Sequence, residues 1–205
     1  ECPSTFLKEV MDLFSLTALE ICEGQQMDME FEQRNDVTAE EYLEMIRLKT
    51  AVLLAASLKI GARLGGTSVE DADRLYDFGM HIGVAFQLKD DLLDVYGNAK
   101  VFGKNIGGDI LCNKKTYMLI KALEHANADQ HNQLNSWINA ETFQPAEKIA
   151  AVTELYDRIG VKAVCENKIL EYSNRAMESL AAVSIAEEKK EELKKIIENL
   201  IHREV

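Results

Sequence analysis

The sequence is short of proline, of basic charge and of long apolar runs. Two prolines in 205 residues, with few alternating β-branched stretches, favour an all-helical chain. The 23 lysines and arginines stand against 35 aspartates and glutamates, giving a net charge of −12. This balance argues against a nucleic-acid partner, because phosphate recognition leaves a strong basic footprint. No apolar run reaches the roughly 20 residues of a membrane helix, so we expect no membrane span.

Cysteine is also scarce and scattered. The four cysteines are Cys2, Cys22, Cys112 and Cys165. None forms a CxxC pair, which argues against a zinc site, and their spacing favours free thiols. We therefore expect a reducing, cytoplasmic compartment.

Several catalytic signatures are missing. The absence of ExxH argues against a di-iron carboxylate bundle, and neither HExxH nor GxSxG occurs. The stretch "GNAKVFGK" (97–104) is similar to a phosphate-binding P-loop, but five residues separate its glycines. It is followed by Asn105 where such loops need serine or threonine.

Helix signals run along most of the chain. Apolar spacing predicts helices over residues 4–31, 38–63, 68–96 and 115–127, and from Pro145 to the end with a break near Gly160. "TAEE" from Thr38 is a capping box, and Gly65 with Gly66 suits the end of that helix. The Gly-rich residues 97–113 and the polar residues 130–144 predict no firm element. Without linkers or repeats, we expect one all-α domain over residues 1–205, a helical bundle.

The segment "FQLKDDLLDVYG" (86–97) concentrates aspartates inside an apolar helix. Asp90 and Asp94 are one turn apart and share a face with Gln87. Mg²⁺ commonly takes one or two protein carboxylates and completes its shell with water and phosphate. Asp91 lies about 100° round the helix from Asp90. The pattern therefore predicts a divalent metal site, with a solvated acidic turn as the alternative.

Lysines flank this segment on both sides. Lys49 and Thr50 stand at the edge of an apolar run, while Lys104 and Lys114 follow the aspartates. Such local positive charge attracts an anion to an otherwise acidic protein. From the rise per residue of an α-helix, Lys49 and Asp90 are offset by about two helical turns along the hairpin that the predicted helices 38–63 and 68–96 form. For Lys49, the alternative is a surface lysine that extends its charged end to water. For the lysines after the aspartates, the alternative is an ordinary solvated loop.

Taken in order, the motifs resemble those of one family. They are GQxxD at 24–28, KT at 49–50, FQxxDDxxD at 86–94, GK at 103–104 and D-x₄-K at 109–114. In this order and spacing the chain resembles the trans-prenyl diphosphate synthases of the polyprenyl synthetase family, of the short-chain farnesyl or geranylgeranyl type. The resemblance implies the all-α bundle of the isoprenoid synthases and covers most of the chain.

The resemblance also implies roles for single residues. It assigns catalysis to Lys49, Thr50, Gln87 and Lys104. The same four residues, together with Lys114, would bind the substrate. Asp90, Asp91 and Asp94 would bind Mg²⁺, or Mn²⁺ in its place. Asp90 would be the principal ligand, Asp94 would act through water, and Asp91 would shape the acidic shell. The lysines would contact the diphosphate.

The implied reaction is prenyl transfer in isoprenoid biosynthesis. Mg²⁺ assists ionisation of an allylic diphosphate, dimethylallyl or geranyl, and isopentenyl diphosphate attacks the resulting cation before a proton is lost. Family members generally form homodimers, so we expect a homodimer. The apolar stripe of the helix over 4–31 suits that purpose.

The chain departs from the family in one large respect. The family's other aspartate-rich motif, the arginines after it and a basic pocket for isopentenyl diphosphate do not occur in this sequence. We therefore expect the C-terminal portion of the fold, without its N-terminal helices and with one of two metal-binding walls. This sequence does not predict the chain length of the product. The alternatives are a non-catalytic subunit or scaffold, an inactive fragment, and a terpene cyclase, which the GK loop disfavours.

Overall fold

The computed structural model describes residues 3–97 and 106–201, and every regular element in these ranges is helical. The elements are α1 (Ser4–Phe31), α2 (Ala39–Ile46), the π-helical turn η1 (Arg47–Ala51), α3 (Val52–Leu64), α4 (Val69–Tyr96), α6 (Gly108–Leu111), α7 (Tyr117–His125), α8 (Ala128–Ile138), α9 (Pro145–Ile159), α10 (Val161–Ala181) and α11 (Glu187–Ile201). The all-α prediction is confirmed. Within the same ranges, no helix has both the length and the apolar character needed to cross a membrane.

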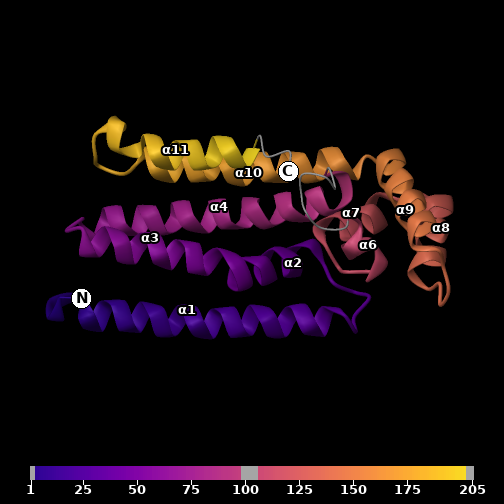
Figure 1. Ribbon diagram of the computed structural model, residues 1–205, viewed down its shortest axis with the longest axis horizontal. Helices are drawn as coiled ribbons and strands as arrows, with labels where there is room; N and C mark the ends of the chain where they lie inside the picture. The colour runs from indigo at the N-terminus through magenta and orange to yellow at the C-terminus, as the bar shows by residue number, and fades with distance from the viewer. Residues whose placement is uncertain (1–2, 98–105, 202–205) are drawn as a thin grey trace.

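The long helices lie side by side and the short ones gather at one end (Figure 1). The central helix, α4, packs most extensively against α3 on one side and α10 on the other. The opposite side of α3 contacts α1, and α11 returns along α10. The C-terminal half of α4 reaches the end where α6 to α9 gather, so the aspartates of this helix lie beside the short helices.

Two glycines let α3 and α4 approach closely. A Cβ atom on Gly79 would lie 2.6 Å from the Cα atom of Ala55, and one on Gly83 would lie 2.5 Å from the Cα atom of Ala51. Any side chain at these positions would meet backbone, so glycine is needed for close packing. This contact sets the register of the hairpin and therefore which residues of η1 face the aspartates of α4.

The predicted helix boundaries are set by local capping. Thr38 Oγ1 accepts a hydrogen bond from Glu41 N at 3.2 Å, and Thr38 N donates to the Glu41 carboxylate at 2.9 Å. Ser68 caps α4 by accepting from Asp71 N at 3.1 Å. Gly66 has a φ of +84° where the chain reverses. The capping box and the antiparallel hairpin are both confirmed.

The structure departs from helical periodicity at η1. The predicted helix over 38–63 is interrupted by one π-helical turn, Arg47–Ala51, which carries Lys49 and Thr50. Here α1 crosses so closely that a Cβ atom on Gly24 would lie 2.5 Å from Lys49 N. A π turn inserts one extra residue and is frequent at functional sites. The extra residue changes which side chains of this segment share a face, which helical periodicity alone does not predict.

Residues 128–138 form a helix that the sequence did not predict. Asn127 and Gln130 make a reciprocal capping box at the start of α8, with both hydrogen bonds at 3.0 Å. In α8, only Gln130 and Leu134 are buried, so its apolar signal is weak. The helix is stabilised by its cap and by packing on α9.

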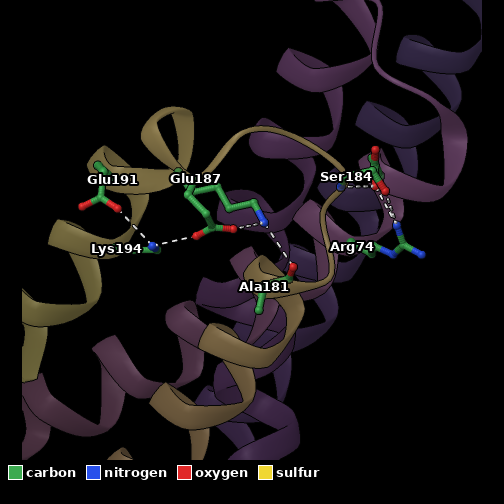
Figure 2. A network of polar contacts seen from close by, with 8 residues as sticks. Arg74, Ala181, Ser184, Glu187, Glu191 and Lys194 are labelled. Carbon is green, nitrogen blue, oxygen red and sulfur yellow. Dashed lines mark hydrogen bonds and ion pairs between the residues drawn. The ribbon is translucent and has the colours of Figure 1, made fainter.

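A polar network anchors the turn between α10 and α11 (Figure 2). Asp71 accepts from Ser184 N at 3.0 Å and from Arg74 at 2.7 Å. On the other side of the turn, Lys190 donates to the Ala181 carbonyl at 3.1 Å and to Glu187 at 2.9 Å. Lys190 is 2% exposed, so the charged run 187–195 contributes a buried lysine to this network.

We expect Asp71→Ala to loosen α11 selectively. Removal of the carboxylate leaves Ser184 N without the acceptor that holds the turn to α4. Amide hydrogens of α11 should then exchange roughly tenfold faster, with little change in α3. Asp73→Ala is the control, because Asp73 lies on the same helix but is exposed and pairs with Lys59 of α3 instead of the turn. Equal protection of α11 in both variants would contradict this prediction.

Candidate functional site

The candidate site lies where the C-terminal half of α4 meets α2, η1 and α6. Of the predicted site residues, only Lys104 lies outside the described residues, and its role stays a prediction. The others are brought together from three segments that are distant in sequence: η1, α4 and the residues after α6. Asp90 and Asp94 are both half-buried and lie on successive turns of α4.

Gly107 and the first residues of α6 lie against Asp94. Asp109 N donates to the Asp94 carboxylate at 2.9 Å, and Gly107 N donates to the Asp94 carbonyl at 2.6 Å. Gly107 has a φ of +84°, a conformation that favours glycine. At Gly108, a Cβ atom would lie 3.5 Å from the Asp94 carboxylate. The "GGD" sequence therefore shapes a backbone that orients Asp94.

Asp91 points inward and is only 3% exposed. Its carboxylate accepts hydrogen bonds from the Tyr42 hydroxyl and from Gln87 Nε2, the latter at 3.2 Å. Burial raises the pKa of Asp91 to about 7, although Lys114 and the Tyr42 hydroxyl act in the opposite direction. Because both oxygens have donors, the membership of Asp91 in the metal shell stays a prediction.

Lys114 joins the cluster from the segment after α6. Its ammonium lies 3.4 Å from the Asp109 carboxylate. Burial lowers the pKa of Lys114, but Asp91 and Asp109 outweigh this and raise it overall. The pKa of Asp109 is also raised, by burial and by Asp94, with Lys114 opposing. The D-x₄-K spacing thus places a charged lysine beside the aspartates.

Lys49 is held by α1. Its ammonium lies 2.6 Å from Asp28, and Gly24 provides the close crossing of the two segments. The GQxxD motif therefore supplies one packing residue and one ion-pair partner. On the opposite side of η1, Thr50 Oγ1 donates to Gln87 Oε1 at 3.2 Å. This contact brings η1 nearer to the aspartates than the two-turn offset predicted from the helical rise.

Carboxylates outnumber lysines in the described part of the cluster. The aspartates are Asp28, Asp90, Asp91, Asp94 and Asp109, and the lysines are Lys49 and Lys114. The described residues contain no group of three or more His, Cys, Asp or Glu side chains arranged to hold a metal. The pair Asp90 and Asp94 instead fits a hard cation that keeps most of its shell for water and phosphate.

An apolar cavity of about 910 Å³ begins at η1 and runs between α3, α4 and α11. Its lining is mostly hydrophobic, with Lys49 and Thr50 among the few polar side chains. Partial exposure of Leu53, Phe86 and Ile196 shows that the cavity is open on one side. The same two residues of η1 therefore belong both to the charged cluster and to the apolar cavity.

Sequence reasoning missed Tyr42 and Gly107. Tyr42 lies on the apolar face of α2 and is 1% exposed, so its pattern is that of a core residue. Nothing in its spacing pairs it with Asp91, which is 49 residues away. The "GG" dipeptide was the available signal for Gly107, since paired glycines often mark positive φ angles.

Comparison with known proteins agrees with this geometry. A family model described as polyprenyl synthetase matches residues 4–156, well over half of the chain. The chain belongs to the polyprenyl synthetase family. The resemblance inferred from its motifs is confirmed, and the matched residues include all eight predicted site positions.

Individual relatives of this polyprenyl synthetase chain match nearly all of it. It is 37% identical to a short chain isoprenyl diphosphate synthase of Methanothermobacter thermautotrophicus, over 98% of this chain and 61% of that protein. A crystal structure of a geranylgeranyl pyrophosphate synthase superposes with a TM-score of 0.92 at 37% identity, over 99% of this chain and 63% of the other.

A second similar crystal structure carries bound groups. It is the geranylgeranyl pyrophosphate synthase of Corynebacterium glutamicum complexed with isoprenyl diphosphate and magnesium, with a TM-score of 0.89 at 29% identity. The match covers 98% of this chain and 57% of that one. The isoprenoid synthase fold is thus confirmed, and the chain spans about three fifths of the length of these relatives.

Proposed function

We propose that this chain provides the allylic-diphosphate side of a short-chain prenyl transferase. The observation that carries the proposal is the position of η1, whose Lys49 and Thr50 join an aspartate cluster to an apolar cavity. A molecule with an anionic head and an apolar tail has complementary surroundings at both ends of this arrangement. An allylic diphosphate, such as dimethylallyl or geranyl diphosphate, has that chemistry.

A divalent cation would bind between the protein and the diphosphate. Asp90 and Asp94 would hold it, with Asp91 behind them, and Mg²⁺ or Mn²⁺ suits this oxygen donor set. When bound, the metal would neutralise charge on the leaving diphosphate. The magnesium and isoprenyl diphosphate in the Corynebacterium relative support this proposal.

The residues of the chain would act on the diphosphate and on the carbon that it leaves. Lys49, Lys114 and the predicted Lys104 would stabilise charge on the departing diphosphate. Its allylic C–O bond breaks with both electrons on oxygen, and the double bond of isopentenyl diphosphate then attacks the cation and a proton is lost. The apolar cavity would limit access of water to that cation.

The test is Mg²⁺-dependent affinity for a non-reactive allylic diphosphate analogue, measured by titration calorimetry. We expect Asp90→Ala and Lys104→Ala each to weaken binding by about 10- to 100-fold, because each removes a charged contact to the bound group. Binding avoids the need for turnover by a chain that spans part of its relatives.

Asp77→Ala is the matched control. Asp77 lies on the exposed side of α4, roughly 20 Å along the helix from Asp90, and its loss should leave affinity unchanged. Equal affinity with and without Mg²⁺, or undiminished affinity in both site variants, would rule out the assignment.

A second candidate is a non-catalytic subunit or scaffold. On α1, Leu7, Met11 and Phe14 are 50%, 50% and 59% exposed and stand one turn apart. This surface supports a homodimer formed through α1, in the enzyme as well as in a scaffold. A dimer that forms without Mg²⁺ and has no affinity for the diphosphate analogue would favour the scaffold.

The free thiols of Cys22, Cys112 and Cys165 support a reducing, cytoplasmic location.

A further inference from the structure

A chain of hydrogen bonds connects the buried core of the bundle to the apolar cavity. Thr50 Oγ1 donates to Gln87 Oε1 at 3.2 Å, and Gln87 Nε2 donates to Asp91 Oδ1 at 3.2 Å. At the inner end, the Tyr42 hydroxyl donates to Asp91 Oδ2. The four residues come from η1, α4 and α2, so the tertiary fold assembles the chain.

The direction of these hydrogen bonds follows from the chemistry of the groups. Gln87 Nε2 is the donor to Asp91, so the amide turns its NH₂ group towards this carboxyl. The Gln87 carbonyl oxygen then faces Thr50 and takes the hydroxyl hydrogen. Thr50 is therefore left with oxygen lone pairs, and not its hydrogen, for the cavity that it lines.

The inner end of the chain is rigid. Tyr42 and Asp91 are 1% and 3% exposed, which locks their rotamers by packing. Hydrogen bonds are stronger in such surroundings than in water, and successive bonds polarise one another. A carboxylate whose two oxygens are already occupied by donors is also poorly placed to become a metal ligand.

We propose that Tyr42 and Asp91 are positioning residues that orient the Gln87 amide and, through it, the Thr50 hydroxyl, so that oxygen lone pairs face the apolar cavity. This inference rests on the proposed function, because a cavity with an inward-facing oxygen dipole favours an allylic cation. Amide and hydroxyl oxygens are weak nucleophiles, so they stabilise a cation without capturing it. Asp91 thus acts through Gln87.

The test compares two ligands of the same shape. One is a quaternary ammonium isoprenoid, and the other is its neutral isostere with carbon in place of nitrogen. Affinity for each is measured by calorimetry with Mg²⁺ and inorganic diphosphate present. We expect the wild-type protein to prefer the cationic ligand about tenfold, the size of one favourable dipole contact.

Three variants separate orientation from charge. Asp91→Asn and Gln87→Met should both reduce the preference to about one, the second without altering any charge. Thr50→Ser keeps the hydroxyl and should retain the wild-type preference. Circular dichroism checks folding in each case, and if Asp91→Asn does not fold, Gln87→Met decides alone.

The outcomes distinguish this inference from the proposed function. Wild-type protein that binds the diphosphate analogue with Mg²⁺ but shows no cation preference would overturn the inference and leave the function intact. An unchanged preference in Gln87→Met would overturn it as well. Loss of Mg²⁺-dependent diphosphate affinity in Asp91→Asn, as in Asp90→Ala, would identify Asp91 as a metal ligand and overturn its positioning role. If the wild-type protein binds no diphosphate, the function and the inference fail together.

Discussion

Replacement of Gly83 by alanine is expected to lower the free energy of unfolding by about 1–3 kcal/mol. The added Cβ atom would lie 2.5 Å from the Cα atom of Ala51 and 2.7 Å from its Cβ atom. Both belong to η1, so η1 and α4 must separate. Urea unfolding followed by circular dichroism measures the change. The displaced helix carries Lys49 and Thr50, so affinity for the diphosphate analogue should fall too.

The matched control is Gly61→Ala. Gly61 lies on α3, and a Cβ atom added there would meet no atom of the described residues within 4 Å. Removing a glycine from a helix interior without a clash stabilises the helix by about 0.5–1 kcal/mol. Equal stability of the two variants would contradict the close-approach argument, since of these two glycines only Gly83 meets backbone.

The second large effect is a dependence of stability on pH through Asp91. Burial raises the pKa of this carboxyl to about 7, compared with 3.8 when unperturbed. The folded state therefore holds its proton more tightly than the unfolded chain, and stability falls as pH rises from about 4 to 7. Between pH 5 and pH 8 the loss from this group is on the order of 3 kcal/mol.

Asp91→Asn removes this titration, so the variant should gain stability relative to the wild type as pH rises. The measurement is urea unfolding of both proteins at pH 5 and pH 8, and the difference between them cancels the titration of other groups. Asp77→Asn, on the exposed side of the same helix, should show no such change. A wild-type-to-variant difference that is the same at both pH values would be incompatible with the raised pKa.

The two arguments about Asp91 support each other. A buried carboxyl that lowers stability at neutral pH has no advantage as a packing residue, because asparagine has nearly the same shape. Residues of this kind cluster at functional sites, where burial and hydrogen bonding serve the chemistry. The hydrogen bonds to Tyr42 and Gln87 agree with the proposed role of this carboxyl in orienting the Gln87 amide.

Much of the fold was predictable from the sequence because its signals are local. Thr38 and Ser68 mark helix starts through caps to residues three positions away. Pro145 marks the start of α9 because proline suits the first helical position. The stacking of Asp90 and Asp94 follows from helical periodicity alone. The order and spacing of the motifs were enough to identify the family. By contrast, α8 was missed because its apolar face is small.

The amino-acid sequence by itself thus determined an all-α chain, its family, and an aspartate pair beside lysines. Tertiary structure alone decided the π-helical turn that carries Lys49 and Thr50, because that turn forms where α1 crosses at Gly24. It also decided that Asp91 faces inward to Tyr42. Both depend on contacts between residues more than 20 positions apart, whereas caps and periodicity report only on neighbours within one or two helical turns.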